Sequence, residues 1–535
     1  MNEFHCRHLP YTETAQFSKI VLDYLEQKPE LRPLFQFEPH WEGMQSQALL
    51  RQSYAEADRA LLVEVLLEQN RDLPNNQLVL SHIEALRSSH TFTITTGHQL
   101  CVFTGPLYFL YKVAHVIKLC AEAKTRCPHL HCVPVFWMAS EDHDFEEVNH
   151  VNVSGQKLKW NKIAKGAVGR LDLEGLEALI EDLSKHIGSG KRQNELITLF
   201  KEAYQGSQNL SQATRKLVHA LFGQEGLVII DPDDKRLKGL MVNIFEKELV
   251  DQAAFKASAP VQGLLNARYG QQALIRPINL FYLDQSRERL EATPNGFTTT
   301  GQNAKTWTQA QLLEELRQQP ERFSPNVILR PLYQERILPN LAYVGGGGEL
   351  AYWLQLKGIF DFFEVPYPIL VLRNSFMFTE AFAEKTKQKL QLSDADLFRK
   401  PEQVLNRFIE EHSTEDLHLL EAKTALNGLY QKLMAEALRL QNGMPGAVEA
   451  EFKRQNRGLV RLRKKLFKAE KRKHQDRLES LEKLHKSLFP NGVLQERHAN
   501  FTDFYLLYGS GFLEAIHQYS RHLDSAFCII SPKYD

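Results

Sequence analysis

Apolar residues recur every three to four positions through most of residues 11–90, which is the spacing of helices with one buried face. Residues 91–96 (TFTITT) are rich in β-branched side chains, and residues 133–138 (VPVFWM) form a short apolar run. Both patterns predict buried strands. A helical pattern over residues 106–124 connects them, and a strand, a helix and a strand in such a short stretch predict a parallel sheet.

Later apolar runs predict three more strands, at residues 226–230, 278–283 and 367–372. Residues 151–225 are more polar and predict an insertion that ends in helices. Residues 285–325 contain turn signals such as Thr293-Pro-Asn-Gly296 and predict loops around a short helix near residues 307–318. The alternation of strands and helices indicates an α/β core with insertions.

In the C-terminal third, leucine and alanine follow alternating steps of three and four residues, which is heptad spacing. One such run covers residues 419–433, and a second begins near Val448 and continues to Leu488. Between them, Asn442-Gly-Met-Pro-Gly446 is expected to break the helix, so the pattern predicts an antiparallel helical hairpin. The heptad spacing drifts between residues 469 and 478.

The 535 residues are too many for one compact core and suggest about three structural units. The chain has 65 basic residues (Lys and Arg) and 65 acidic residues (Asp and Glu), so we expect no nucleic-acid partner. It has no run of about 18 apolar residues, so we expect no membrane partner. The N-terminus lacks a secretory pattern and the six cysteines form no CxxC pair, which favours free thiols and a cytoplasmic location. Residues 453–473 carry eleven basic residues and one acid, and a solvated coiled-coil face is favoured over a nucleic-acid or phosphate site.

The loop after the first predicted strand, TGHQLCVFTGPLY, is the first candidate site. In open parallel sheets, ligands bind at the carboxyl ends of strands, where helix N-termini attract anions. Gly97 and Gly105 allow a ligand to approach the backbone closely, and His98 and Gln99 can donate hydrogen bonds to a phosphate or carboxylate. Lys112 can add a positive charge. The alternative is a turn with a surface histidine.

Trp137-Met-Ala-Ser-Glu-Asp-His-Asp144 directly follows the second predicted strand and is the second candidate site. Three carboxylates and an imidazole occur in four consecutive residues, and repulsion among the carboxylates would raise some of their pKa values unless a cation or a substrate amine lies nearby. The cluster therefore fits a general base that accepts a proton from an amine, a magnesium site, or a clamp for an ammonium group. A solvated acidic loop is the alternative, and zinc is less expected because thiolates are absent. The residues concerned are Glu141, Asp142, His143 and Asp144, with Asn149 and His150 within reach.

Four glycines precede a predicted helix in Tyr343-Val-Gly-Gly-Gly-Gly-Glu-Leu-Ala-Tyr-Trp353. Such a run, which includes Gly346 and Gly347, can form an anion-binding nest of backbone N–H groups. Glu349 and Tyr352 would face the same cleft from the first turn of the helix. A flexible connector is the alternative.

Several motifs, taken in order along the chain, resemble those of a known family. They are Thr96-Gly-His-Gln99, Gly105-Pro-Leu-Tyr108 with Tyr111-Lys112, Val133-Pro-Val-Phe-Trp137 with Glu141-Asp-His-Asp-Phe-Glu-Glu-Val-Asn-His150, Leu338-Pro339 with Gly348-Glu-Leu-Ala-Tyr-Trp353, Lys468-Ala-Glu-Lys-Arg-Lys473, and Phe489-Pro-Asn-Gly492 with Leu494-Gln-Glu-Arg497. The family is that of the bacillithiol biosynthesis cysteine-adding enzymes (BshC, cysteine ligase). The resemblance covers nearly the whole chain.

The resemblance implies a Rossmann-like parallel-sheet core, similar to nucleotidyltransferases and class I aminoacyl-tRNA synthetases, with insertions and an α-helical antiparallel coiled-coil domain that supports a homodimer. We expect the first part of the core in residues 1–155, a connecting insertion in 156–225, and the second part of the core in 226–385, itself interrupted near 285–325. The remaining units are then the helical coiled-coil domain in residues 386–495 and a C-terminal segment in 496–535 that docks on the core.

The resemblance also implies the last step of bacillithiol synthesis, in which the carboxyl group of L-cysteine is joined to the amine of glucosaminyl-malate. A free carboxylate must be activated before it forms an amide, so we expect ATP or another nucleotide, with Mg²⁺, as cofactors. The HxGH and KMSKS signatures of the synthetases are absent, so adenylate and acyl-phosphate activation both stay open. The alternatives are an ATP-dependent ligase for another amino sugar and a non-catalytic, nucleotide-sensing coiled-coil adaptor.

We expect His98 and the cluster Glu141–Asp144 to be catalytic. Lys112 and Arg330 are candidates for pairing with the two malate carboxylates, which favour basic partners. The further candidates for binding substrate or nucleotide are Gly97, Gln99, Gly105, Tyr108, Trp137, Asn149, His150, Gly346, Gly347, Glu349, Tyr352 and Arg497. The general base, the presence of a metal and the position of the nucleotide stay open.

Overall fold

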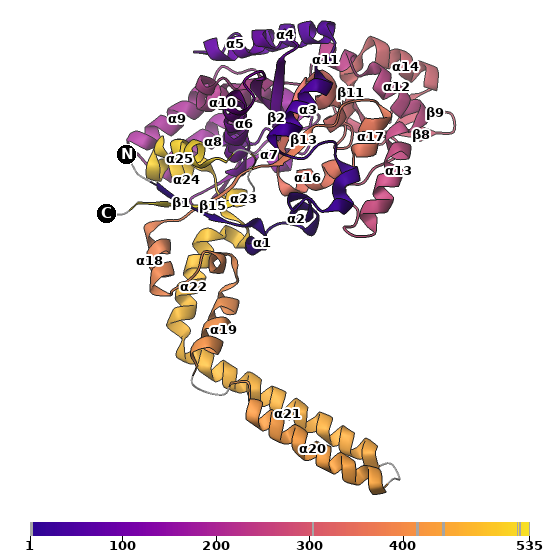
Figure 1. Ribbon diagram of the computed structural model, residues 1–535. Helices are drawn as coiled ribbons and strands as arrows, with labels where there is room; N and C mark the ends of the chain where they lie inside the picture. Colours follow the sequence, from indigo (N-terminus) through magenta and orange to yellow (C-terminus); the bar gives the residue numbers. More distant parts are fainter. Residues whose placement is uncertain are drawn as a thin grey trace. The chain divides into compact units, whose positions relative to one another are not determined.

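The computed structural model describes residues 4–301, 304–413, 417–440, 444–521, 523 and 526–533. The chain folds into two compact units (Figure 1). The first comprises Met1–Phe378 and Val493–Asp535, and the second comprises Thr379–Gly492. None of the helices in the described residues is long and apolar enough to cross a membrane.

Five parallel strands form the central sheet of the first unit, in the order β13-β12-β2-β3-β6. Their bounds are β2 (Thr91–His98), β3 (His131–Met138), β6 (Val228–Ile230), β12 (Asn340–Gly345) and β13 (Ile369–Leu372). Every residue of β2 is buried, as expected at the centre of a parallel sheet. The predicted parallel sheet is confirmed, with strands at four of the predicted positions, namely residues 91–96, 133–138, 226–230 and 367–372.

Strand β12, which lies between β13 and β2, is not predicted by the apolar pattern of the sequence. Its first residue, Asn340, is polar, yet its side chain is fully buried. The hydroxyls of Thr93 and Thr95 donate to Asn340 Oδ1 at 3.0 and 2.8 Å, and Asn340 Nδ2 donates to Glu335 at 2.8 Å. Because these partners satisfy the buried amide, a polar residue can begin a strand inside the core.

A second sheet, in the order β10-β9-β8-β7-β11, is antiparallel throughout. Its strands are β7 (Leu280–Leu283), β8 (Arg287–Thr293), β9 (Gly296–Thr299), β10 (Thr306–Trp307) and β11 (Phe323–Pro325). Strand β7 confirms the prediction at residues 278–283. The prediction of loops over residues 285–325 is wrong, because the turn at Thr293-Pro-Asn-Gly296 joins two paired strands. The short helix predicted near residues 307–318 is present as α14 (Gln309–Gln318).

Helices surround these sheets and build the insertion after β3. Helix α6 (Tyr108–Arg126) connects β2 with β3 and confirms the helix predicted over residues 106–124. The polar stretch 151–225 contains the hairpin of β4 (His150–Val153) and β5 (Gln156–Lys159) and then helices, as predicted. The other α-helices described in this unit are α1 (Tyr11–Thr14), α2 (Lys19–Leu25), α3 (Trp41–Arg51), α4 (Glu56–Asn70), α5 (Gln77–Ala85), α7 (Phe145–Val148), α8 (Leu176–Ile187), α9 (Lys191–Tyr204), α10 (Leu210–Phe222), α11 (Lys235–Gly239), α12 (Val242–Asp251), α13 (Ala253–Asn266), α15 (Arg330–Ile337), α16 (Gly347–Leu354), α17 (Lys357–Phe362), α23 (Gln495–His498), α24 (Phe501–Tyr508) and α25 (Gly511–Tyr519).

The two ends of the chain meet in a third sheet, in the order β1-β15-β14 (Figure 1). Strand β1 (Phe4–Leu9) pairs antiparallel with β15 (Phe527–Pro532), and β15 runs parallel to β14 (Ser375–Phe378). Phe4 and Ile530 belong to a core cluster that also contains residues of α6. The last strand of the chain is therefore part of the first unit.

The second unit consists of helices. They are α18 (Ala381–Lys389), α19 (Pro401–His412), α20 (Leu420–Leu440), α21 (Met444–Lys473) and α22 (Gln475–Leu488). Helix α20 packs on α21, and the rings of Tyr430 and Phe452 lie 5.2 Å apart, which confirms the predicted hairpin. Of the predicted break, Asn442-Gly443 lies outside the described residues, whereas Met444 begins α21. The drift in heptad spacing coincides with the boundary between α21 and α22 at His474.

The apolar seam of the helical hairpin is only partly covered within one chain. None of the described residues of α21 is buried, which agrees with a solvated face for its many basic side chains. Four leucines at the heptad positions have exposed fractions between 38% and 53%, namely Leu429, Leu433, Leu462 and Leu466. A hairpin with this much exposed leucine has apolar surface available for a partner.

Candidate functional site

A cavity of about 670 Å³ lies at the carboxyl ends of β2, β3 and β12. Because these strands are parallel, the residues that follow them meet at one edge of the sheet. Gly97 and His98 end β2, Trp137 lies near the end of β3, and Tyr343 lies near the end of β12. The antiparallel sheet contributes a further wall, with Phe281 on β7. The cavity is thus built by the central and the antiparallel sheet together.

Most of the residues that the sequence predicts for a site line this cavity. They are Gly97, His98, Gln99, Tyr108, Lys112, Trp137, Glu141, Asp142, Arg330, Gly346, Gly347, Glu349, Tyr352 and Arg497. The fold therefore brings the three candidate stretches of the sequence, Arg330 and Arg497 to one place.

Five predicted residues do not line the cavity, namely Gly105, His143, Asp144, Asn149 and His150. Gly105 has a φ of +65° and packs against Cys101 in the turn before α6. The Asp144 carboxylate accepts a hydrogen bond from the backbone N–H of Glu147 at 3.2 Å and caps α7. His150 Nδ1 lies 3.0 Å from the backbone oxygen of Glu146. The contacts of Asp144 and His150 are local, whereas His143 lies beside Arg287 and the Gly105 carbonyl accepts a hydrogen bond from Asn500 Nδ2 at 2.6 Å.

His98 is buried beside two aromatic rings. Its ring centroid lies 5.2 Å from that of Tyr108 and 5.3 Å from that of Phe109. Burial, together with the positive charge of Lys112, lowers the pKa of His98 to about 3. The imidazole is therefore neutral at physiological pH, and it can donate or accept a hydrogen bond without carrying charge.

Lys112 and Glu349 form an ion pair at the cavity wall, where α6 faces α16. Lys112 Nζ also donates to the backbone oxygen of Gly97 at 2.9 Å. Burial alone would raise the pKa of Glu349, but the charge of Lys112 and hydrogen bonds from Lys112, Tyr343 and the Gly346 N–H lower it to about 2. This pair connects the loop after β2 to the glycine stretch after β12.

The acidic cluster after β3 divides into side chains with different partners. Glu141 is buried and forms an ion pair with Lys238, whose side chain is fully buried. Burial raises the pKa of Glu141, although the positive charge of Lys238 acts in the opposite direction. The Asp142 side chain is 30% exposed in the cavity, and its nearest cation, Arg287, lies at 3.9 Å. His143 Nδ1 lies 3.1 Å from Arg287 Nη1. Asp142 is thus the carboxylate of this cluster that is most accessible to a ligand in the cavity.

Glu147 is a further carboxylate in the cavity lining; it lies within the motif Glu141–His150 but was not predicted as a site residue. Gln99 Nε2 donates to Glu147 at 3.2 Å, which joins this carboxylate to the loop after β2. Burial, followed by the negative charges of Asp142 and Asp144, raises the pKa of Glu147. A raised pKa makes a carboxylate a stronger base, so Glu147 is suited to accept a proton.

The four glycines form the end of β12 and the beginning of α16. The backbone N–H of Gly346 donates to the Glu349 carboxylate at 2.8 Å, so one donor of the expected nest already has a partner. Added Cβ atoms at Gly347 and Gly348 would meet nothing closer than 3.5 Å. The backbone of these two residues is therefore accessible to a ligand from the cavity.

Four arginines in the cavity lining were also not singled out by the sequence patterns, namely Arg276, Arg287, Arg289 and Arg373. Two of them flank one aromatic ring, since the guanidinium carbons of Arg287 and Arg289 lie 4.1 and 5.2 Å from the Phe281 centroid. They stand two residues apart on β8, so their side chains point to the same face. Recognition of β8 as a strand would have revealed this pair.

The arginines differ in whether they already have an acidic partner. Arg373 donates twice to the buried Glu496, at 2.9 and 2.6 Å. Within the described part of the chain, no carboxylate lies within 4.0 Å of Arg276, Arg289 or Arg497. These three guanidinium groups are available to bind an anionic ligand.

The cavity lining carries more positive than negative side chains. Its seven cations are Lys112, Arg276, Arg287, Arg289, Arg330, Arg373 and Arg497, and its four carboxylates are Glu141, Asp142, Glu147 and Glu349. With His98 neutral, the excess of cations favours ligands that carry several negative charges. Polyvalent anions such as phosphates and dicarboxylates therefore fit the lining best.

The acidic cluster does not form a metal site of three protein ligands. Among the described residues, the group of His, Cys, Asp and Glu side chains whose ligand atoms lie within 4.8 Å of one another is elsewhere, at Cys6, His8 and Cys528. Glu141 is paired with Lys238, which leaves Asp142 as the accessible carboxylate of the cluster. A magnesium ion here would depend mainly on ligand phosphates and water, as Mg²⁺ commonly does in phosphate sites.

Comparison with known proteins places nearly the whole chain in one family. Residues 4–374 match the model described as "Bacillithiol biosynthesis BshC, N-terminal Rossmann-like domain", and residues 376–532 match "Bacillithiol biosynthesis BshC, C-terminal coiled-coil domain". These matches confirm the Rossmann-like core and the coiled coil expected from the sequence.

Curated relatives are similar over nearly their full length. A "Putative cysteine ligase BshC" from Flavobacterium johnsoniae is 41% identical over 98% of this chain and 99% of its own. Proteins of the same name from Flavobacterium psychrophilum and Christiangramia forsetii are each 40% identical, and 98% of this chain and of each relative is covered. A solved structure titled "Crystal structure of putative arginyl t-RNA synthetase from Campylobacter jejuni" aligns with 85% of this chain and 100% of its own chain at 9% identity. Its TM-score of 0.22 supports no statement about fold or function.

Proposed function

Because the chain belongs to the BshC family of bacillithiol biosynthesis, we propose that it is a cysteine ligase, which joins the carboxyl group of L-cysteine to the amine of glucosaminyl-malate. The observation that carries this proposal is the cavity at the carboxyl ends of the parallel strands, with seven cations and four carboxylates in its lining. Both proposed substrates carry carboxylates, and the acceptor also carries an amine. A lining with both signs of charge can hold both kinds of group.

The proposed reaction needs an activated carboxyl group, because amide formation from a free carboxylate is uphill in water. We propose that a nucleoside triphosphate, most simply ATP with Mg²⁺, supplies this activation. The accessible backbone of Gly347 and Gly348 and the N-terminus of α16 support phosphate binding near the end of β12. Which phosphate bond breaks is decided by the nucleotide product, ADP or AMP.

The unpaired arginines are the best candidates for the malate group of the acceptor. Arg276 and Arg289 lie together beside the antiparallel sheet, where their mutual repulsion contributes to lowering the pKa of Arg289 after the larger effect of burial. Two neighbouring cations without acidic partners match a ligand that brings two carboxylates. Binding of malate would relieve this repulsion.

The carboxylates after β3 are the candidates for handling the acceptor amine. An ammonium group must lose a proton before its nitrogen attacks a carbonyl carbon. We assign the role of base to Glu147, whose pKa is raised, and the role of positioning the ammonium group to Asp142, which is accessible in the same cavity. Neutral His98 would donate a hydrogen bond to the activated carboxyl group or to phosphate.

We also propose that the chain forms a homodimer through its coiled coil. The four exposed leucines of α20 and α21 support this proposal, because exposed apolar side chains at heptad positions of a helical hairpin are stabilised by burial against a second copy. The substrates are small molecules, and a cytoplasmic location agrees with free thiols.

The test is a reconstitution with purified full-length protein, L-cysteine, glucosaminyl-malate, ATP and Mg²⁺, followed by mass spectrometry of the thiol and nucleotide products. We expect an amide product with ADP or AMP. Asp142→Asn is expected to lower turnover at least 100-fold, whereas Glu146→Gln, outside the cavity lining, should leave it near normal.

Two results would overturn the proposal. The first is the absence of an amide product from folded protein that still binds nucleotide, which would favour a nucleotide-sensing adaptor. The second is turnover of a different amino sugar with a higher kcat/KM than glucosaminyl-malate, which would identify another acceptor. Normal turnover of Asp142→Asn would remove this residue from the mechanism.

A further inference from the structure

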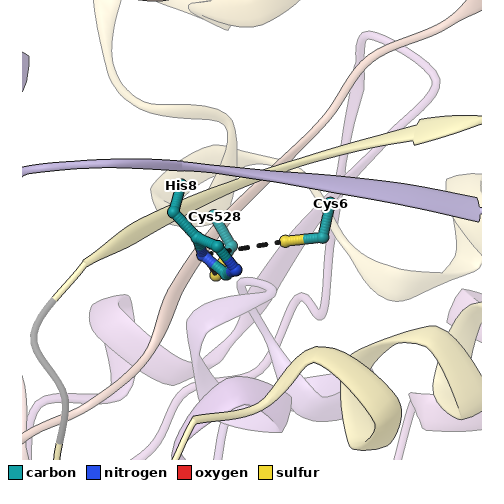
Figure 2. Close-up of side chains that lie close together, drawn as sticks. All are labelled: Cys6, His8 and Cys528. Atoms are coloured by element: carbon teal, nitrogen blue, oxygen red, sulfur yellow. Dashed lines mark hydrogen bonds between the residues drawn. The ribbon is translucent and has the colours of Figure 1, made fainter.

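Three potential metal ligands converge on the sheet that joins the two ends of the chain. Cys6 and His8 lie on β1, and Cys528 lies on β15. The two strands pair antiparallel with His8 directly opposite Cys528. Because side chains alternate along a strand, Cys6 and His8 share one face of β1, and Cys528 is on the same face of the sheet. Figure 2 shows the three side chains turned toward one another.

The spacing of their donor atoms is close to that of a tetrahedral zinc site. Cys528 Sγ lies 3.3 Å from His8 Nδ1, Cys6 Sγ lies 4.0 Å from the same nitrogen, and the three donor atoms lie within 4.8 Å of one another. Zn–S bonds of about 2.3 Å and Zn–N bonds of about 2.0–2.1 Å at tetrahedral angles require separations of about 3.6 Å for S···N and about 3.8 Å for S···S. Small side-chain rotations would bring the three atoms to these distances.

The ligand types select the metal. Two thiolates and one imidazole are a soft to borderline donor set, which favours Zn²⁺ over Mg²⁺ or Ca²⁺. We propose that Cys6, His8 and Cys528 bind one zinc ion, with water in the fourth position. Cys528 is buried, Cys6 is half-buried and His8 is exposed, so the open position faces solvent on the His8 side.

The strand register argues against a disulfide bond as the purpose of the two thiols. Cys6 is paired with Ile530 and Cys528 with His8, so the two cysteines are diagonal neighbours across the sheet. Diagonal Cβ atoms are typically about 7 Å apart, whereas a disulfide needs about 3.5–4.5 Å. A zinc ion between the sulfurs spans the longer separation without movement of the backbone.

A zinc ion here would link the first described strand to the last one. Thiolates on β1 and β15 are brought together only when the chain is folded, so the free energy of zinc binding adds to the free energy of folding. The site is separate from the proposed ligase reaction, because none of its three residues lines the cavity. Zinc removal is therefore expected to affect stability before it affects turnover.

The test uses full-length protein kept reduced by a reductant that contains no thiol, freed of metal with a chelator and then titrated with Zn²⁺ or Co²⁺. We expect one ion per chain, a cobalt spectrum typical of tetrahedral thiolate coordination, and a higher Tm with zinc. Cys6→Ser and His8→Ala should each weaken zinc binding at least tenfold and change the cobalt spectrum. His5→Ala is the matched control, since His5 is exposed on the opposite face of β1, and it should bind like the wild type.

The outcome that overturns the proposal is equal zinc affinity of wild type, Cys6→Ser and His8→Ala, or a cobalt spectrum without thiolate bands in the wild type. Cys528→Ser is less informative because Cys528 is buried and the substitution can unfold β15. Cys6 and His8 are more exposed, and circular dichroism of their variants verifies that the fold is retained. A metal-dependent Tm that both variants preserve would likewise assign the zinc to another site.

Discussion

The ion pair between Lys112 and Glu349 holds two of the cavity loops together, and Glu349→Gln tests this role. The wild-type carboxylate accepts hydrogen bonds from the Tyr343 hydroxyl and the Gly346 N–H as well as from Lys112. Glutamine retains the shape and one acceptor oxygen but removes the negative charge. The Lys112 side chain is only 4% exposed, so it would remain as a nearly buried cation without its partner.

The cost follows from the burial of the pair. Removal of one partner of a fully buried ion pair typically costs about 3–5 kcal/mol. Because the Glu349 side chain is 25% exposed and glutamine keeps an acceptor, we expect a loss of about 2–3 kcal/mol. With an unfolding entropy of about 2.1 cal/mol/K per residue and roughly 420 residues in the first unit, the Tm of that unit should fall by about 2–3 °C.

The pH dependence gives this prediction a second readout. The pKa of Glu349 is about 2 in the folded protein, below the ordinary value of 4.5. A carboxyl group with a lowered folded pKa contributes stability that is present above its unfolded pKa and is lost as the pH falls through the folded value. The difference in stability between wild type and Glu349→Gln should therefore be constant at neutral pH and shrink below about pH 4.5.

Urea unfolding and thermal melts of the two proteins at pH 7 and pH 4 measure both effects. The matched control is Glu122→Gln on α6, the helix of Lys112. The Glu122 carboxylate lies 3.7 Å from Lys118 and 4.0 Å from Arg126, and its partner Lys118 is 31% exposed, against 4% for Lys112. This control should change stability by less than about 0.5 kcal/mol. Equal stability of Glu349→Gln and Glu122→Gln would show that the buried pair contributes little. A difference in stability between wild type and Glu349→Gln that stays the same at pH 4 would contradict the lowered pKa of Glu349.

Three further predictions concern the cavity and the coiled coil. Arg289→Ala should raise the KM for glucosaminyl-malate about tenfold or more, because a charge-assisted hydrogen bond is lost. Arg317→Ala is the control and should leave the KM unchanged, because Arg317 and its partner Glu246 lie outside the cavity. A wild-type KM for Arg289→Ala would exclude Arg289 from the acceptor site. His98→Gln should lower kcat but leave the shape of the pH–rate profile between pH 5 and 9 as in the wild type, because His98 is neutral above about pH 3. A titration step near neutrality that is present in the wild type and absent from the variant would contradict this. Leu429→Lys should halve the molar mass measured by light scattering, and an unchanged mass would place any dimer interface elsewhere.

Much of the site was predictable because many of its residues directly follow strands that are easily recognised from their apolar and β-branched sequence. The runs TFTITT and VPVFWM predict buried parallel strands, and the polar residues after such strands meet at one edge of a sheet. His98 and Asp142 were found in this way, whereas Glu349 was found from the four glycines that precede a predicted helix. The loops after these strands needed no long-range information to be recognised.

The arginines of the second sheet were not predictable in the same way. Arg287 and Arg289 lie in a stretch where turn signals and charged residues outnumber apolar ones, so it does not have the pattern of a strand. They form β8 because β7 and β9 pair with it on both sides. Their approach to the cavity depends on contacts between segments far apart in the sequence.

By itself, the sequence determined the parallel core, the helical hairpin and the family, since periodicity and short motifs are local properties that each segment carries alone. Only the tertiary structure decided which charged groups are already paired. Lys112 with Glu349, Lys238 with Glu141, and Arg373 with Glu496 meet across separations of roughly 100–240 residues. In the described part of the chain, the cavity arginines without a carboxylate within 4.0 Å are Arg276, Arg289, Arg330 and Arg497, and these are left for a ligand. Charge pairing depends on distances of a few ångströms between distant segments, and no pattern along a single chain encodes those distances.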